Sequence, residues 1–259
     1  MSAIVSFTPF RMGGQVSPES FFGRADVIRT VVRNLRHKAN VAVFGPPRSG
    51  KSSLLYVLFK NYRHAEPDAL TWFVDLDGVT TLDNLIEEFY TGMKSDKTDY
   101  TLSEFAKSLK QWQQRLVVFI DTADRFSKPP FNDEALFAVL ATHLQSQHLS
   151  LCMATSRPPE TLFTNRVGPP LHSLFIRCDL PPFTLEECKQ FIQLRLQWTG
   201  IDFDGDEMDA LVTESGGQPA TLQRLAAELF RRKVIEQVLR VDLANFAKSR
   251  PLASWRMTR

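Results

Sequence analysis

The sequence has few cysteines, almost no net charge and no long apolar stretch. Its three cysteines, Cys152, Cys178 and Cys188, show no C-x-x-C spacing. This argues against a disulfide framework or a zinc site and favours a reducing compartment. The five histidines form no H-E-x-x-H pattern, so that metal-binding motif is missing as well.

The charge and the N-terminal residues indicate which partners and which compartment to expect. Lysine and arginine total 31 and aspartate and glutamate 29, so the net charge of +2 gives no strong reason to expect nucleic acid, although it does not exclude it. Residues 1–10 lack a basic region followed by an apolar one, and no run approaches the roughly 20 apolar residues that span a bilayer. We therefore expect a soluble cytoplasmic protein with no membrane partner.

Five short apolar runs alternate with amphipathic stretches, which is typical of a parallel sheet wrapped by helices. The runs predicted as strands are 41–44, 71–75, 116–120, 149–153 and 174–178. Helices are predicted at 53–62, 82–93 and 133–145 and from Thr101, where T-L-S-E forms a capping-box pattern. After Cys178 no β-like run appears, and helices are predicted at 185–198, 206–214, 219–238 and 242–247.

The most informative motif is G-P-P-R-S-G-K-S at residues 45–52, which fills the phosphate-loop pattern G-x-x-x-x-G-K-[ST] between an expected strand and an expected helix. Backbone N–H groups of such a loop, with the positive end of the helix, fit the α- and β-phosphates of a nucleotide. Lys51 then reaches the β- and γ-phosphates, and the Ser52 hydroxyl ligates Mg²⁺. The residues expected to bind the phosphates are Gly45, Pro46, Pro47, Arg48, Ser49, Gly50, Lys51, Ser52 and Ser53.

A second acidic site is expected where the run 116–120 ends. Asp121 follows this run and is predicted to hold Mg²⁺ opposite the phosphates, directly or through a metal-bound water. Many ATPases of this class have Glu at the next position, but Thr122 stands there and does not take a proton at neutral pH. Asp124 either orients the hydrolytic water in its place or only starts a helix.

A third candidate follows the fourth run. If this strand lies between the strands of the two preceding motifs, Arg157 lies beside the γ-phosphate and distinguishes triphosphate from diphosphate. The alternative is an exposed arginine before Pro158. The expected catalytic residues are thus Lys51, Asp121, Asp124 and Arg157.

Six motifs in this order resemble those of the STAND group of AAA+-related P-loop ATPases, and the resemblance covers nearly the whole chain. Phe22-Gly23-Arg24 is similar to the hhGR box, and residues 8–18 resemble the leader before it. Residues 121–124 resemble the Walker B segment, 155–157 sensor 1 and 180–187 the entry to the lid. Residues 216–219 resemble the G-x-P motif, whose proline, here Pro219, packs on adenine.

The resemblance implies an α/β fold with a five-stranded parallel P-loop core (AAA+/ASCE-like) followed by a small all-helical lid domain. The change of pattern after Cys178 places the boundary near residue 179, so the core is expected over residues 1–178 and the lid, with a basic tail, over 179–259. It implies ATP or ADP with Mg²⁺, with Phe22, Gly23, Arg24 and Pro219 near the nucleoside. Arg224 is either a sensor 2 arginine or a solvated helix residue.

The function implied is a slow, ATP-controlled regulatory switch that acts on protein partners or on its own copies. Residues 121–125 also resemble transposition-regulator and replication-type AAA+ ATPases that assemble on DNA. A DNA-associated ATPase that oligomerises on duplex is therefore one alternative, and a non-hydrolysing nucleotide-binding scaffold is another. The basic and aromatic tail either contacts nucleic acid or is a disordered terminus.

Overall fold

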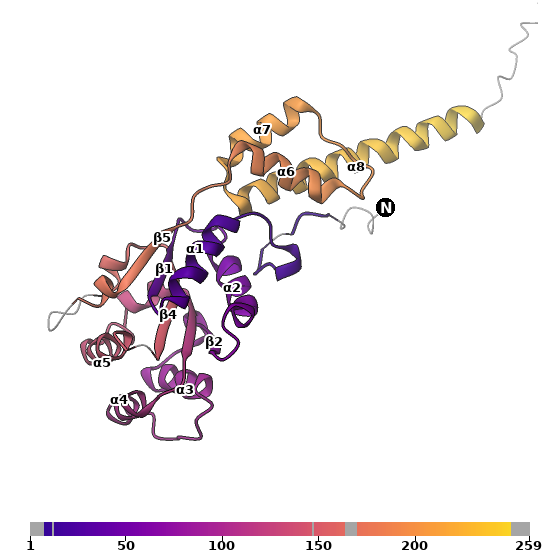
Figure 1. Cartoon of the computed structure of the whole chain (residues 1–259). Coiled ribbons are helices and arrows are strands. Elements are labelled where there is room, and N and C mark those ends of the chain that lie inside the picture. Colours follow the sequence, from indigo (N-terminus) through magenta and orange to yellow (C-terminus); the bar gives the residue numbers. More distant parts are fainter. Residues whose placement is uncertain (1–7, 12, 147, 164–169, 250–259) are drawn as a thin grey trace, which may run out of the picture. The chain divides into compact units, whose positions relative to one another are not determined.

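The structure, a computed structural model, describes residues 8–11, 13–146, 148–163 and 170–249. Its chain forms two compact units, an α/β unit of Gly14–Pro181 and a helical unit that contains the residues from Pro182 onward (Figure 1). The described residues before Gly14 belong to the helical unit, although they were expected in the first domain. The expected basic tail beyond residue 249 lies outside the described residues.

The α/β unit contains one five-stranded sheet in the order β2-β3-β4-β1-β5, and all neighbouring strands are parallel. The strands are β1 (Asn40–Phe44), β2 (Leu70–Asp75), β3 (Leu116–Asp121), β4 (Leu149–Thr155) and β5 (Phe175–Asp179). The predicted fold class is therefore confirmed. The order also places β4 between β1 and β3, which was the condition attached to the interpretation of Arg157.

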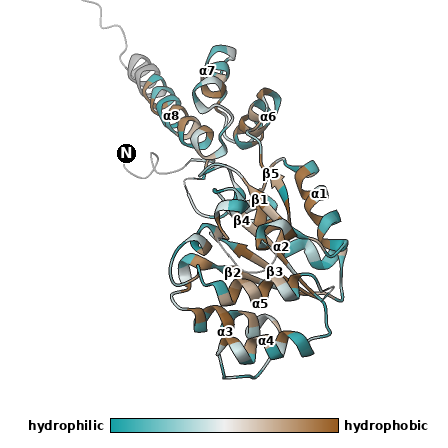
Figure 2. Ribbon diagram, turned by 90° about the vertical axis from the view of Figure 1, so that its left-hand side faces the viewer, coloured by the Kyte–Doolittle hydropathy of each residue, from teal (hydrophilic) through white to brown (hydrophobic). Residues whose placement is uncertain are grey.

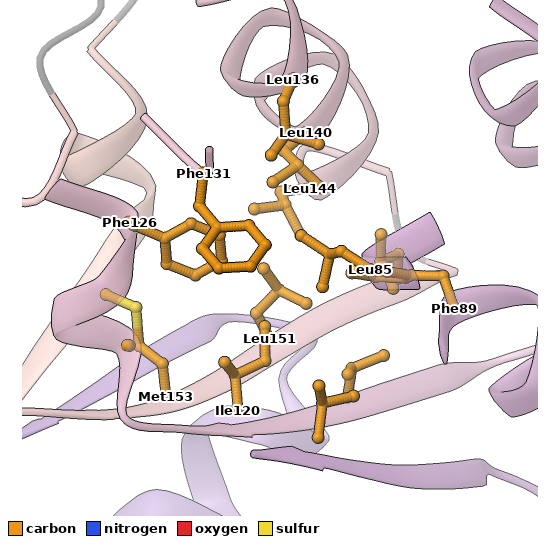
Figure 3. Close-up of a cluster of buried hydrophobic side chains, with 14 of the residues drawn as sticks. Leu85, Phe89, Ile120, Phe126, Phe131, Leu136, Leu140, Leu144, Leu151 and Met153 are labelled. Atoms are coloured by element: carbon orange, nitrogen blue, oxygen red, sulfur yellow. The ribbon is translucent and has the colours of Figure 1, made fainter. Parts of the chain in front are cut away.

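Side-chain alternation along the buried strands divides the core into two layers. In β3, Val118 and Ile120 join the layer that faces α3, α4 and α5, whereas Val117 and Phe119 join the layer that faces α1 and α2. Both faces are covered, so β3 and β4 are buried along their whole length. Most of their residues are hydrophobic (Figure 2). Figure 3 shows side chains of the first layer, among them Ile120, Leu151, Phe126 and Leu140.

The helices of this unit are α1 (Ala25–Arg36), α2 (Lys51–Ala65), α3 (Leu82–Gly92), α4 (Leu102–Gln111) and α5 (Glu134–Leu144), with short 3-10 turns η2 (Pro18–Ser20), η3 (Leu76–Gly78), η4 (Ala123–Ser127), η5 (Pro159–Thr161) and η6 (Leu171–Leu174). Thr101 caps α4 by accepting from the backbone N–H of Glu104, as predicted. The other half of the predicted capping box does not form, because the Thr101 N–H donates to Asp99 and the Glu104 carboxylate pairs with Lys97.

The helical unit consists of α6 (Leu185–Leu196), α7 (Gly205–Ser215) and α8 (Pro219–Ser249). A capping box of Thr184 and Glu187 begins α6, as predicted. The predicted break between 238 and 242 is wrong, because α8 is one helix. No glycine or proline occurs at 238–242, and Asp242 reads as a helix cap only when the flanking residues are not already helical.

Phe10 forms part of the core of the helical unit. It is 1% exposed, and its ring lies 6.3–6.5 Å from the rings of Phe191, Phe203 and Phe230. Aromatic pairs at this spacing add to the free energy gained by burying the rings. In the described part of the chain, no helix has the length and apolar character needed to cross a bilayer.

Candidate functional site

The polar residues of the α/β unit gather where its parallel strands end. The register pairs Asp75 with Asp121, and Phe44 with Thr155, at the carboxyl ends of the strands. In open α/β sheets ligands bind outside this edge, at the point where the strand order reverses. The loop from β1 to α2 starts at this edge, so the phosphate-loop motif and the acidic residues are brought together.

The loop 45–50 is shaped by its glycines. A Cβ on Gly45 would lie 2.9 Å from the Ser49 hydroxyl oxygen, and Gly50 has a φ of 97°, in the left-handed region. Arg48 also has a positive φ, of 66°. The N-cap residue of α2, Gly50, has no side chain with which to cap the helix, so the first N–H groups keep their capacity to bind an anion.

Lys51, the first residue of α2, folds over this loop. Its Nζ donates to the carbonyl oxygens of Gly45 and Pro46, each at 2.8 Å. Burial lowers the pKa of Lys51, and the negative charges of Asp124 and Asp121 oppose that shift. The ammonium is thus held at the loop by carbonyl groups that a phosphate, as a charged acceptor, outcompetes.

Ser52 and Asp121 meet as the motifs predicted. The Ser52 hydroxyl donates to Asp121 Oδ1 at 3.0 Å, and the backbone N–H of Thr122 donates to the same oxygen at 2.9 Å. Gln15 Nε2 donates to Asp121 Oδ2 at 3.4 Å. Burial raises the pKa of Asp121, and the bonds from Ser52 and Thr122 oppose this. A hydroxyl and a carboxylate oxygen side by side fit Mg²⁺, which takes one or two protein oxygens and completes its shell with phosphates and water.

Asp124 connects η4 to the end of β4. The backbone N–H of Ser156 donates to both of its carboxylate oxygens, at 2.9 and 3.2 Å, and the Thr155 hydroxyl donates to Oδ1 at 3.3 Å. The carboxylate therefore fixes the loop that carries Arg157. Arg157 itself is exposed, and its Nη1 donates to the Ser127 hydroxyl at 3.2 Å, so its guanidinium lies against η4.

Two residues near Asp121 were missed by the sequence analysis. Asp75 accepts from the Thr122 hydroxyl at 3.0 Å. Its signal was present, since it ends a predicted strand, but only the strand order places it beside Asp121. Nothing in the sequence indicated that Gln15 contacts Asp121, because a single polar residue outside any motif or periodic pattern does not predict a site. Val16, next to it, donates its backbone N–H to the Ser53 hydroxyl at 3.1 Å.

The residues expected near the nucleoside are divided between the two units. Gly23 and Arg24 have φ angles of 70° and 65° and form the tight turn after Phe22 that starts α1, where Arg24 is buried. Pro219 begins α8 in the helical unit, after Gly216 and Gly217.

The backbone fixes the G-x-P turn within the helical unit. The Gly217 carbonyl accepts from Phe183 N–H at 2.8 Å, and a Cβ on Gly217 would lie 2.3 Å from the Phe183 carbonyl oxygen. Arg224 is exposed on α8 and pairs with Glu228, one turn further along the helix, at 3.0 Å. This contact is typical of a solvated helix residue, one of the two roles considered for Arg224.

The fold is shared with solved P-loop ATPases. The Walker-type ATPase of Pyrococcus abyssi superposes with a TM-score of 0.59 and 16% identity over 93% of this chain and 80% of that one. The Aeropyrum pernix ORC1 protein, solved in complex with DNA, gives a TM-score of 0.60 at 15% identity over 82% of this chain. The Thermotoga maritima RuvB Holliday junction branch migration motor gives 0.51 at 19% identity over 86%.

This chain spans 61% of the ORC1 chain and 65% of the RuvB chain. No curated protein matches the sequence. The family model described as Novel STAND NTPase 1 matches residues 9–247. Because that match covers nearly the whole chain, from the leader into α8, the protein belongs to the novel STAND NTPase 1 family and is a P-loop NTPase of the STAND and AAA+-related type.

Proposed function

We propose that the protein is a slow ATPase that acts as a nucleotide-controlled switch on protein partners. The observation that carries this is the arrangement of Lys51, Ser52 and Asp121 at one edge of the sheet, followed by Thr122 where a proton-accepting glutamate is expected. The first three residues bind ATP and Mg²⁺. The fourth does not act as a base, so any base must come from another position, and we expect turnover well below the median enzyme rate of about 10 per second.

Each residue has a distinct part in this proposal. Lys51 leaves the carbonyls of Gly45 and Pro46 and pairs with the β- and γ-phosphates. Ser52 and Asp121 hold Mg²⁺, which offsets the charge that develops on the phosphate oxygens. Arg157 moves from Ser127 to the γ-phosphate when ATP is bound.

The switch follows from the bond between Asp124 and Ser156. Since this carboxylate joins η4 after β3 to the loop after β4, a change at the metal-binding residue Asp121 is transmitted through η4 to Arg157. Loss of the γ-phosphate removes the partner of Arg157 and releases the loop. Such γ-phosphate-dependent ordering of a segment is a known form of switching.

Two features favour a protein partner over DNA. The net charge is +2, with lysine and arginine spread along the chain, whereas duplex binding depends on gathered basic residues. The helical unit also exposes apolar side chains on α6 and just after it: Leu194 is 53% and Trp198 89% exposed. Exposed apolar groups of this kind are typical of surfaces that bind protein.

The DNA-associated alternative is supported by the fold likeness to an ORC1 protein solved in complex with DNA and to a branch migration motor. In that case the chain oligomerises on duplex with ATP. The scaffold alternative requires ATP binding without turnover, with Thr122 as its main support.

One experiment separates the three functions: the switch on protein partners, the DNA-associated ATPase and the scaffold. The mass of the protein is measured with ADP and with a non-hydrolysable ATP analogue, with and without duplex DNA, and phosphate release is followed in parallel. The proposal expects slow, Mg²⁺-dependent release and no DNA-dependent assembly. Tight, salt-sensitive duplex binding only with the ATP analogue would favour the DNA-associated ATPase, and binding without release would favour the scaffold.

A further inference from the structure

We infer that Asp75 supplies the carboxylate that accepts the proton of the hydrolytic water. This inference rests on the ATPase activity proposed above and names the base that Thr122 does not provide. Four features of the structure carry it: the place of Asp75 in the sheet, its remaining hydrogen-bonding capacity, the different use of Asp124, and the conformation of Thr122.

Asp75 lies beside the metal-binding carboxylate. It is the last residue of β2 and the register partner of Asp121, the last residue of β3. Because β2 and β3 are parallel, both side chains are at the carboxyl edge of the sheet. The charge of Asp75 contributes to the raised pKa of Asp121, so the two carboxylates are within electrostatic reach of each other.

Asp75 keeps one oxygen available. Its Oδ1 accepts from the Asp77 N–H at 3.1 Å and from the Thr122 hydroxyl at 3.0 Å. Among the described residues, no hydrogen bond is made to its Oδ2. Since Asp75 is also exposed, a water molecule can reach Oδ2.

Asp124 is used differently. Both of its oxygens accept from the Ser156 N–H, and Oδ1 also accepts from Thr155. Proton transfer to Asp124 would weaken these bonds and release the loop after β4. A carboxylate that fixes a loop in this way is better suited to transmit a signal than to take up a proton in each turnover.

Thr122 joins Asp75 to Asp121. Its φ of 54° lies in the left-handed region, which is uncommon for a β-branched residue. In this conformation its N–H donates to Asp121 and its hydroxyl to Asp75. The residue at the position of the expected glutamate therefore holds a carboxylate from the neighbouring strand.

The step balances without a further reactant. The water oxygen forms a bond to the γ-phosphorus while the bond from that phosphorus to the bridging oxygen of the β-phosphate breaks. Asp75 Oδ2 takes the proton of the water, and the bridging oxygen leaves with the electron pair as part of ADP. The proton then passes from Asp75 to solvent, so ATP and water yield ADP, inorganic phosphate and one proton.

The test compares Asp75→Asn with Asp77→Asn, which removes a neighbouring exposed charge that makes no bond to Thr122. Single-turnover hydrolysis and the Kd of a non-hydrolysable ATP analogue are measured for both. We expect Asp75→Asn to lower the rate by about 100-fold or more, the usual contribution of a general base, with the Kd changed less than threefold. Asp77→Asn should stay within twofold of wild type, and Asp75→Glu should recover at least tenfold over Asp75→Asn.

Thr122→Val separates proton transfer from structural support. It removes the hydroxyl that binds Asp75 but keeps the carboxylate, so a loss below tenfold is expected. A loss equal to that of Asp75→Asn would show that Asp75 acts only by holding Thr122, which overturns the inference. A rate for Asp75→Asn within threefold of an active wild type would also overturn the inference. The ATPase activity proposed above would still stand in that case. A wild type that binds the analogue but never hydrolyses ATP would refute both.

Discussion

The α/β unit and the helical unit distribute their side chains in opposite ways. In the described part of the chain, one large apolar side chain of the α/β unit is exposed, Ile176, against five in the helical unit: Leu185, Leu194, Trp198, Ile235 and Leu239. The α/β unit buries both faces of its sheet and presents polar groups at one edge. This contrast fits the proposed function, in which the polar edge of the first unit binds nucleotide and the apolar surface of the second contacts a protein partner.

The largest effect is expected when a buried aromatic side chain of the α/β unit is replaced, in comparison with an exposed one of the helical unit. Phe119 in β3 is fully buried, with its ring 6.0 Å from that of Phe59, whereas Trp198 is 89% exposed. Phe119→Ala should lower the free energy of unfolding by about 3–5 kcal/mol, and Trp198→Ala should change it by less than about 0.5 kcal/mol. Urea unfolding of both variants measures this. Similar losses would remove the contrast between the units.

A smaller effect is expected within the helical unit, where Phe10 fills a gap among three rings. Phe10→Ala should lower the free energy of unfolding by about 3 kcal/mol, because the Phe10 ring is buried in the core of this unit. Hydrogen exchange should speed up in α6 and α8 and stay unchanged in β3. Phe10→Leu, which keeps an apolar side chain, is the control. Faster exchange in β3 as well would place Phe10 in the other core.

Lys51→Ala tests the polar edge of the α/β unit. In the proposed function Lys51 supplies the mobile cation between the β- and γ-phosphates, so its removal should lower ATP affinity at least tenfold, or by about 1.4 kcal/mol. Lys60, exposed on the same helix, is the matched control, and its replacement by alanine should leave the affinity unchanged. Titration calorimetry measures both. An equal affinity for wild type and Lys51→Ala would refute the phosphate-loop assignment.

The smallest expected effect is a gain of stability, on replacing Asp121. Burial raises the pKa of Asp121 above its ordinary value of 3.8, so its charged form destabilises the folded state at neutral pH. This cost is present above the folded pKa and disappears as the pH falls below 3.8. Asp121→Asn should therefore raise the Tm of the nucleotide-free protein at pH 7 and weaken Mg²⁺-dependent ATP binding. A lower Tm at pH 7, measured by calorimetry, would contradict this reading.

Most of the α/β fold was predictable because its strands carry local signals. All five apolar runs became strands, and the phosphate-loop glycines specify a turn that few other residues form. The meeting of Ser52 with Asp121 followed from the motifs. In the helical unit, Asp242 shows where local signals fail: it suggested a new helix, but nothing before it ended the previous one.

The sequence by itself determined the parallel sheet, the phosphate-loop motif and the pairing of Ser52 with Asp121, because periodicity and glycine placement act over a few neighbouring residues. The tertiary structure alone decided what surrounds that pair. Strand order placed Asp75 beside Asp121, the loop after β4 took up both oxygens of Asp124, and Phe10 entered the core of the helical unit. These contacts join residues far apart in the chain, and their partners are set by which faces and edges the folded backbone brings together, which no local pattern encodes.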